Sequence, residues 1–150
     1  MRVAILESIV MPAGHEVEFD RILINELKQQ GHEPVLFVPE NFPFKVDYGV
    51  DIVYLEGGEG VTYAGASKWK KPFLSILRER RRRSWFTSAA QKIKEHNIDA
   101  LIIPTGTYRY IKALLDTPLK DSPAAVHVIF HGIGKGEMDR FIKQAHRANA

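Results

Sequence analysis

Hydrophobic and polar positions change their period along the first part of the chain. Residues 2–6 are a short, nearly continuous apolar run, which indicates a strand buried on both faces. Apolar residues then recur at helical spacing across 16–30, and Gly31 stands where a left-handed helix C-cap belongs. A second apolar run follows at 35–38. A buried strand, a helix and another buried strand predict the right-handed parallel unit from which doubly wound sheets are built.

The rest of the chain continues this alternation. Residues 72–96 carry an apolar face that is interrupted by four arginines at 80–83, so this segment is either one long helix or two helices with a break near Ser84. Asn97 ends it in both cases. The other expected elements are strands at 51–55, 99–103 and 124–130 and helices at 107–116 and 137–148. This order predicts the α/β class, with one Rossmann-like domain over 1–150, three α/β/α layers and a mostly parallel sheet of strand order 3-2-1-4-5.

The composition is that of an ordinary soluble domain, with 45% hydrophobic and 26% charged residues. The chain has no cysteine, which excludes disulfides and thiolate metal sites. No apolar run reaches the roughly 18 residues of a transmembrane helix, and no signal peptide is recognised. We therefore expect a cytoplasmic protein with no metal site and no cofactor.

The net charge of +3 is distributed unevenly. Of the 21 Lys and Arg side chains, eight lie within residues 68–83, together with one of the 18 acids, so the remaining chain carries 13 basic and 17 acidic residues. Trp69, Phe73, Trp85 and Phe86 accompany this basic segment. Basic residues beside aromatic ones suit an anionic membrane surface, nucleic acid or an anionic substrate. The segment therefore indicates an anionic partner, which we expect to be a membrane surface or an acceptor in preference to nucleic acid.

The common nucleotide-binding motifs are absent. The first strand–helix loop, residues 7–15, has no G-x-G-x-x-G, and no acid ends the second strand, where Val38 and Pro39 stand. Residues 131–136 (HGIGKG) lack the Lys-Ser/Thr ending of a P-loop. Hydride transfer and P-loop chemistry are therefore not expected. The glycines of GGEG at 57–60 indicate a flexible loop.

Candidate site residues come from the ends of the strands, because ligands of open α/β sheets bind at the carboxyl edge. His15 and His131 follow separate strands and could face one crevice, where imidazole can act as a base or bind a hydroxyl. Gly132 and Lys135 belong to a glycine-rich loop before a helix, which suits a phosphate or carboxylate or is only a flexible turn. Four consecutive arginines cannot share one outward face, so at least one should turn towards the domain, and Arg81 is our candidate.

With these residues identified, the chain resembles the N-terminal domain of GT-B glycosyltransferases, most closely the family-4 retaining enzymes. The matching segments are the strand at 2–6 with its Pro/Gly loop, Gly14-His15-Glu16, Asp20 and Leu27 on the first helix, GHEPV at 31–35, NIDALII at 97–103 and VIFHG at 128–132.

The resemblance implies an acceptor-binding domain of an enzyme of carbohydrate biosynthesis, which moves a sugar from a nucleotide-sugar donor to an acceptor. The donor would bind only together with a second Rossmann-like domain, which 1–150 does not include, so the isolated domain is expected to be inactive. The resemblance implies His131 as the catalytic residue of this half. The substrate-binding candidates are Gly14, His15, Gly132, Lys135 and Arg81.

Two other functional classes remain open from the sequence. One is a stand-alone binding or regulatory module of flavodoxin-like shape. The other is a nucleic-acid-binding domain that uses Arg80–Arg83, for which steep salt dependence would be expected. The identities of the donor and the acceptor do not follow from the residues.

Overall fold

The computed structural model describes residues 1–8, 14–42, 49–61 and 65–149. They form a five-stranded sheet of order β3-β2-β1-β4-β5 in which every neighbouring pair is parallel. The strands are β1 (Arg2–Leu6), β2 (Glu33–Pro39), β3 (Asp51–Leu55), β4 (Ala100–Ile103) and β5 (Ala125–Val128). The predicted α/β class and the strand order 3-2-1-4-5 are thereby confirmed.

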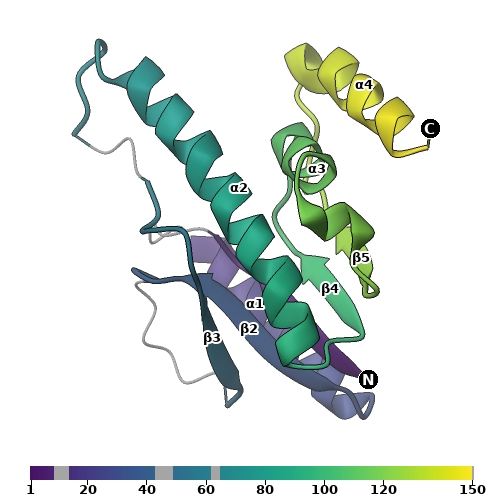
Figure 1. Cartoon of the computed structure of the whole chain (residues 1–150). Helices are drawn as coiled ribbons and strands as arrows, with labels where there is room; N and C mark the ends of the chain where they lie inside the picture. The colour runs from purple at the N-terminus through teal and green to yellow at the C-terminus, as the bar shows by residue number, and fades with distance from the viewer. Residues whose placement is uncertain (9–13, 43–48, 62–64, 150) are drawn as a thin grey trace.

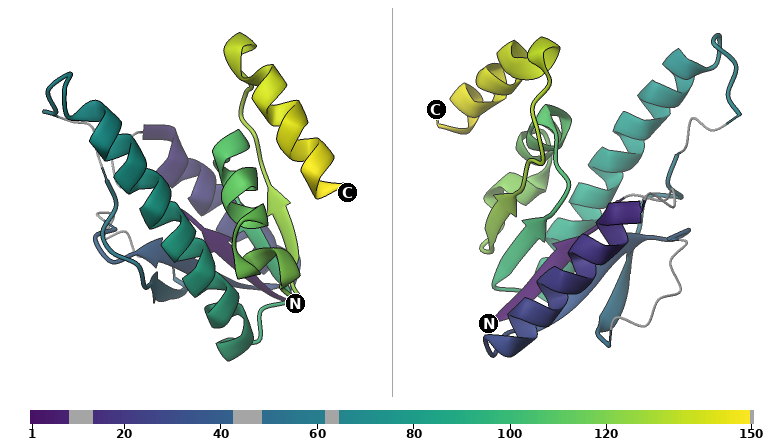
Figure 2. Two further views of the ribbon diagram at one scale, coloured as in Figure 1. Left: turned by 45° about the horizontal axis from the view of Figure 1, so that its top comes forward. Right: turned by 180° about the vertical axis from the view of Figure 1, so that it is seen from behind.

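Helices cover both faces of this sheet (Figures 1 and 2). They are α1 (Gly14–Gln29), α2 (Lys71–Glu95), α3 (Tyr108–Leu115) and α4 (Met138–Ala148), with short 3-10 helices η1 (Pro118–Asp121) and η2 (Lys135–Glu137). None of the helices in the described ranges combines the length and the apolar character needed to traverse a bilayer.

The alternating side chains of the strands divide the core into two parts. On one face, Leu6 and Phe37 pack with Phe86 of α2 and with side chains of α3 and η1. On the other face, Ile24 of α1 packs with Ile5. Both faces of the central strands are therefore buried, which is why their sequences read as continuous apolar runs.

The helix ends follow the predicted signals. Gly31 has a φ of +85°, and the next amide, that of His32, donates to the Leu27 carbonyl at 2.9 Å, which is a Schellman closure of α1. Asn97, with a φ of +53°, ends α2 in the same way, since the Ile98 amide donates to Ile93 at 2.9 Å. Both predicted stops are confirmed.

The segment around the four arginines is a single helix of 25 residues, so the one-helix alternative is correct. Arginine is a good helix former, and after Pro72 at its start α2 contains neither proline nor glycine. By contrast, β5 is shorter than the predicted 124–130 and ends at Val128. Its pairing partner β4 ends at Ile103. The Ile129 amide still donates to the Ile103 carbonyl, but the Ile129 carbonyl accepts from the Gly106 amide at 2.9 Å, one residue beyond the regular register, so the regular ladder ends there.

The sheet has a topological switch point between β1 and β4. The chain leaves β1 towards α1 on one face and leaves β4 towards α3 on the other face (Figure 2). These two adjacent strands are thus followed by helices on opposite faces, the arrangement at which a crevice forms at the carboxyl edge of open α/β sheets.

Candidate functional site

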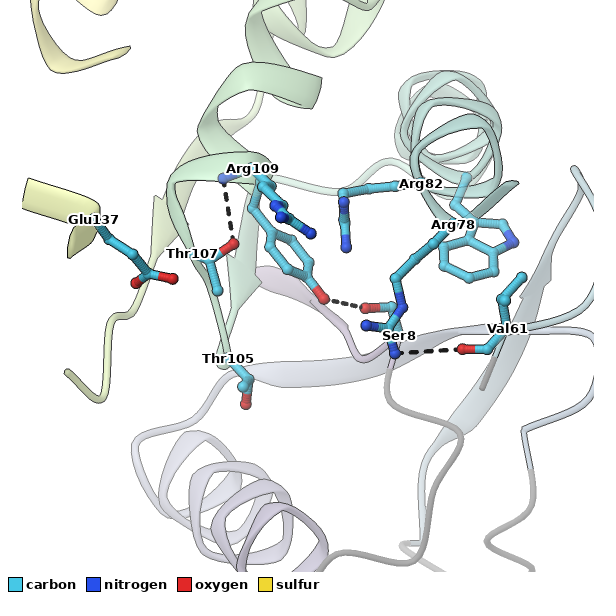
Figure 3. Close-up of a pocket in the computed structure, with 10 residues that line it drawn as sticks. Ser8, Val61, Arg78, Arg82, Thr105, Thr107, Arg109 and Glu137 are labelled. Atoms are coloured by element: carbon cyan, nitrogen blue, oxygen red, sulfur yellow. Dashed lines mark hydrogen bonds between the residues drawn. The ribbon is translucent and has the colours of Figure 1, made fainter. Parts of the chain in front are cut away.

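A pocket of about 440 Å³ lies at this carboxyl edge, on the side of the sheet that α2 and α3 cover (Figure 3). Ser8 comes from the end of β1 and Thr105 from the end of β4, so the pocket includes the switch point. Its lining is Ser8, Val61, Arg78, Arg82, Trp85, Thr105, Thr107, Arg109, Tyr110 and Glu137. Five separate parts of the chain thus build one concave surface.

Arg82 is the most deeply buried charged residue of this lining, with 6% of its surface exposed. Its Nη1 donates to Glu79 Oε1 at 2.6 Å, and its guanidinium lies 4.6 Å from the centre of the Tyr110 ring. Its Nε has no hydrogen-bond partner among the described residues. The expectation that one arginine of 80–83 turns towards the domain is confirmed, and the residue is Arg82.

Arg78 and Arg109 add two further guanidinium groups from α2 and α3 (Figure 3). Arg78 Nη2 approaches the Val61 carbonyl at 3.4 Å. Arg109 Nη1 lies 3.9 Å from Glu79 Oε1, the same oxygen that pairs with Arg82. One acid therefore helps to position two of the three arginines.

Hydroxyl groups complete the polar lining. Ser8 Oγ and the Tyr110 hydroxyl share a hydrogen bond of 2.6 Å, which joins the end of β1 to α3 (Figure 3). Thr107 is the N-cap of α3, and its Oγ1 accepts from the Arg109 amide at 3.2 Å. The cap fixes the first turn of α3, and with it the direction in which Arg109 leaves the helix.

Tyr108 lies between two arginines beside the pocket. Its hydroxyl accepts from Arg109 Nε at 3.2 Å and from Arg140 Nη1 at 3.0 Å. The hydrogen bond from Arg109, supported by that from Arg140, holds the pKa of Tyr108 below its ordinary value, although burial acts in the opposite direction. This contact also connects α4 to the start of α3.

The glycine loop after β3 forms one edge of the site and is ordered by contacts with α2. Gly57 and Gly58 have φ angles of +124° and +104°. The Gly58 carbonyl accepts from Trp85 Nε1 at 2.9 Å, and the Gly57 carbonyl accepts from Arg81 Nη1 at 3.1 Å. The interpretation of these glycines as a flexible loop is therefore wrong for Gly57 and Gly58, which allow the loop to pack directly against the helix.

The sequence-derived candidates lie around this pocket and not in its lining. Arg81 contacts the Gly57 carbonyl. The exposed His131 donates from Nε2 to the Pro104 carbonyl at 2.6 Å, and its ring meets that of Phe19 of α1 edge-on at 5.0 Å. His131 is thus at the carboxyl edge, against the helix of the opposite face.

The remaining candidates are less closely associated. Gly14 begins α1, and the side chain of its neighbour His15 lies outside the described part of the chain. Gly132 and Lys135 are exposed before α4. The glycines of this loop do not have positive φ angles, so the loop does not form a nest of alternating backbone conformations. Within the described part of the chain, no hydrogen bond or ion pair joins Gly132 or Lys135 to Gly14.

Sequence reasoning located the correct edge but missed the residues that line the pocket. Ser8 and Thr105 directly follow β1 and β4, so the strand-end rule could have found both of them. Arg78 belongs to the basic segment 68–83, but nothing in the sequence indicated that it meets Arg109 in one pocket, because their convergence depends on how α2 and α3 are rotated. In the described ranges no cluster of three His, Cys, Asp or Glu side chains could hold a metal ion.

Comparison with known proteins establishes the fold. No family model and no curated protein matches the sequence. Solved structures do match: the fold is that of a Rossmann-like domain of GT-B glycosyltransferases. The chain is similar to MurG from Acinetobacter baumannii, with 17% identity and a TM-score of 0.55. It is also similar to the calicheamicin glycosyltransferase CalG4, with 14% identity and a TM-score of 0.59. A third similar structure is that of the glycosyltransferase VinC in complex with dTDP, with 15% identity and a TM-score of 0.54.

These matches cover nearly all of this chain and a minor part of the other proteins. The region aligned with MurG is 99% of this chain and 40% of MurG. For CalG4 the aligned region is 99% of this chain and 37% of CalG4, and for VinC it is 97% of this chain and 39% of VinC. The chain therefore spans about 40% of the length of the enzymes that it resembles. The comparison does not separate one GT-B family from another, so the family-4 resemblance stays a prediction.

Proposed function

We propose that this chain is the acceptor-binding domain of a glycosyltransferase, which moves a sugar from a nucleotide-sugar donor to an acceptor. The fold and the fraction of the glycosyltransferases that it matches support this proposal. VinC, one of these proteins, was solved with a nucleoside diphosphate. Transfer would need a second, nucleotide-sugar-binding domain, and this chain alone would be inactive.

The observation that carries the proposal is the position of the pocket. It lies at the switch point, where Ser8 and Thr105 follow adjacent strands. Its volume of about 440 Å³ lies within the range of small-molecule sites, and its lining offers guanidinium and hydroxyl donors. An acceptor group held there would present its nucleophile at the edge where the second domain would bring the donor.

In this proposal the residues around the pocket form the rest of the cleft edge. His131 would face the reacting sugar, held in place by the Pro104 carbonyl and the Phe19 ring. The other proposed substrate contacts are Gly14, His15, Gly132, Lys135 and Arg81. Gly14 and His15 would contact the substrates from the start of α1, Gly132 and Lys135 from the segment before α4, and Arg81 from α2.

The test is to compare acceptor and donor binding to this chain by NMR. Saccharide and lipid-headgroup acceptor candidates should shift the amides of Ser8, Thr107 and Tyr110 at lower concentrations than nucleotide sugars do. No sugar transfer should be detected with the chain alone. Binding of nucleotide sugars in preference to every acceptor, or turnover by the chain alone, would contradict the proposal.

A second proposal, that the domain binds an anionic membrane, rests on the outer end of α2. We call this surface the α2 tip and define it as Lys68, Trp69, Lys70, Lys71, Phe73 and Ile76. Trp69, Phe73 and Ile76 are 87%, 73% and 56% exposed, and the three lysines are exposed beside them. Aromatic and apolar side chains among lysines are typical of peripheral membrane surfaces.

The electrostatics of the helix support the same interpretation. The α2 tip includes the N-terminal end of α2, where the helix dipole is positive, yet its first turn has no acid and its N-cap residue makes no side-chain cap. Lys70 and Lys71 therefore add positive charge to an end that already favours anions. A phospholipid headgroup would relieve this repulsion while the aromatic rings enter the interface.

A further inference from the structure

Three guanidinium groups face one pocket at the carboxyl edge of the sheet, and they suggest what that pocket binds. We propose that Arg78, Arg82 and Arg109 bind a phosphate group of the acceptor. This inference rests on the proposed function, because it takes the ligand of the pocket to be the acceptor. It goes further by naming the chemical class of that ligand.

Arg82 shows that the site is built into the fold. The side chain is buried, and Glu79 and the Tyr110 ring hold its guanidinium from two sides. Its Nε has no hydrogen-bond partner among the described residues. A buried charge with an unsatisfied donor is unfavourable, and Arg82 shares Glu79 with Arg109, so an oxyanion in the pocket would help to balance the charge of Arg82.

The charge balance of the pocket favours an anion. Among the described residues, the lining contains the three arginines Arg78, Arg82 and Arg109 and one acid, Glu137, while Glu79 contacts Arg82 and Arg109 from beside the pocket. Basic groups therefore outnumber acids in the described lining. Because guanidinium groups donate in a planar fork, they pair well with the oxygens of an anion.

The number of donors favours phosphate over carboxylate. Besides the arginines, the lining contains the hydroxyls of Ser8, Thr105 and Thr107 (Figure 3). A carboxylate has two oxygens, which two guanidinium groups can saturate. A phosphate has a tetrahedral set of oxygens and can accept from donors that approach from α2, α3 and both strand ends at once.

The pocket differs from the basic surface of the α2 tip. Arg80 and Arg83 belong to the same helix as Arg82, but they are exposed and do not line the pocket. They therefore provide matched controls: each removes one positive charge from α2 without removing a group from the pocket. A general attraction of anions to a basic helix would respond to either kind of substitution.

The experiment is an NMR titration of the 150-residue chain with inorganic phosphate at constant ionic strength. A parallel titration with acetate measures the binding of a carboxylate. We expect saturable shifts of the Ser8, Thr107 and Tyr110 amides with phosphate and weaker binding of acetate. Arg78→Gln and Arg109→Gln, each at a half-buried position, should weaken phosphate binding by about tenfold, since each removes one charged hydrogen bond. Arg80→Gln and Arg83→Gln should leave it unchanged.

Several results would overturn the inference. They are phosphate shifts confined to the α2 tip, equal losses in the pocket and control variants, or acetate binding as tightly as phosphate. The amide spectrum reports whether each variant is folded. If Arg109→Gln does not fold, Arg109→Lys takes its place, because lysine keeps the charge but lacks the planar guanidinium. If phosphate fails to bind while neutral acceptors still shift the pocket amides, this inference is wrong and the proposed function stands.

Discussion

At Gly57, both the backbone conformation and the packing require a residue without a side chain. Its φ of +124° lies in a region that L side chains rarely adopt. An added Cβ would lie 2.4 Å from Ser84 Cβ and 3.1 Å from the Ser84 carbonyl carbon. The loop after β3 can therefore approach α2 only because this position has no side chain.

We predict that Gly57→Ala lowers the free energy of unfolding by about 2 kcal/mol, because it introduces backbone strain and a clash with a helix that cannot move aside. Urea denaturation followed by circular dichroism measures the effect. Gly132→Ala is the matched control, since Gly132 has no positive φ and no atom within 4 Å of an added Cβ. Equal denaturation midpoints for the two variants would contradict the prediction.

The four arginines at 80–83 show what can and what cannot be predicted from sequence for a single residue. The helical repeat requires that four consecutive side chains point in different directions, so one of them had to face the domain. Which one it is depends on the rotation of α2, and Trp85 and Phe86 fix this by packing in the core. The pattern of residues 80–83 alone does not contain that information, and for this reason Arg82 was not singled out.

At the scale of elements, one acid helps to join α3 and α4. Asp116 follows α3 and accepts from Arg147 of α4 at 2.7 Å, while Arg83 of α2 lies 3.9 Å away. The hydrogen bond from Arg147 holds the pKa of Asp116 below its ordinary value, against the opposing effect of burial. Three helices therefore meet around a carboxylate that must stay ionised.

The lowered pKa determines how stability should depend on pH. The unfolded chain binds a proton at Asp116 at higher pH than the folded chain does, so this stabilisation is present above the ordinary pKa of aspartate. It is lost as the pH falls through the lower, folded-state pKa. We predict that Asp116→Asn lowers the free energy of unfolding by about 0.5–1 kcal/mol at pH 7 and that its difference from the wild type shrinks in acid.

Denaturation of both proteins between neutral and acid pH tests this prediction. Asp121→Asn serves as the control, because Asp121 is an exposed acid on the neighbouring η1. If Asp116→Asn differs from the wild type by the same amount at every pH, the ion pair does not account for the difference. Raised ionic strength should also reduce the effect, since the pair is partly exposed.

Prediction from sequence was most successful at the scale of elements. Apolar runs and helical spacing identified the five strands and four helices, because each of these patterns is local. The length of β5 was overestimated, since residues 124–130 are mostly apolar but the regular ladder ends after Val128, where the Ile129 carbonyl accepts from Gly106. The end of a strand depends on its pairing partner, so it cannot be predicted from the residues of that strand alone.

At the scale of the whole molecule, the α2 tip lies at the outer end of the long helix α2 (Figure 1). We predict that the chain co-sediments with anionic liposomes and not with neutral ones, and that replacing Lys68, Lys70 and Lys71 with Gln abolishes binding. Each lysine near an anionic surface contributes about 1 kcal/mol at low salt. In a chain that keeps these lysines, Trp69→Ala with Phe73→Ala should weaken binding by removing apolar burial.

The control removes the same charge elsewhere, with the exposed residues Lys94, Lys120 and Lys143 changed to Gln. Replacing the arginines at 80–83 would be unsuitable, because Arg81 and Arg82 make contacts within the domain. Equal binding by the control and the α2 tip variant would contradict the membrane role. An oligonucleotide that displaces the liposomes would favour nucleic acid as the partner of this surface.

The candidate site could be predicted only in its general location. The strand-end rule gave the carboxyl edge, but the pocket is built from residues that lie as far apart in sequence as Ser8 and Glu137. Their convergence depends on helix rotation and on loop packing, both of which are properties of the whole fold. His131 and Arg81, chosen from local motifs, lie at the same edge but do not line that pocket.

The central position of β1 also has a consequence for how the protein is made. β1 pairs with β2 nearby in sequence, but its other neighbour is β4, and the Arg2 amide donates to Asp99, 97 residues away. Closing so long a loop slows folding, and a chain still on the ribosome presents β1 as an unpaired apolar edge until β4 has been synthesised. Chaperones would therefore have their greatest effect on this protein during translation, before its second half has emerged.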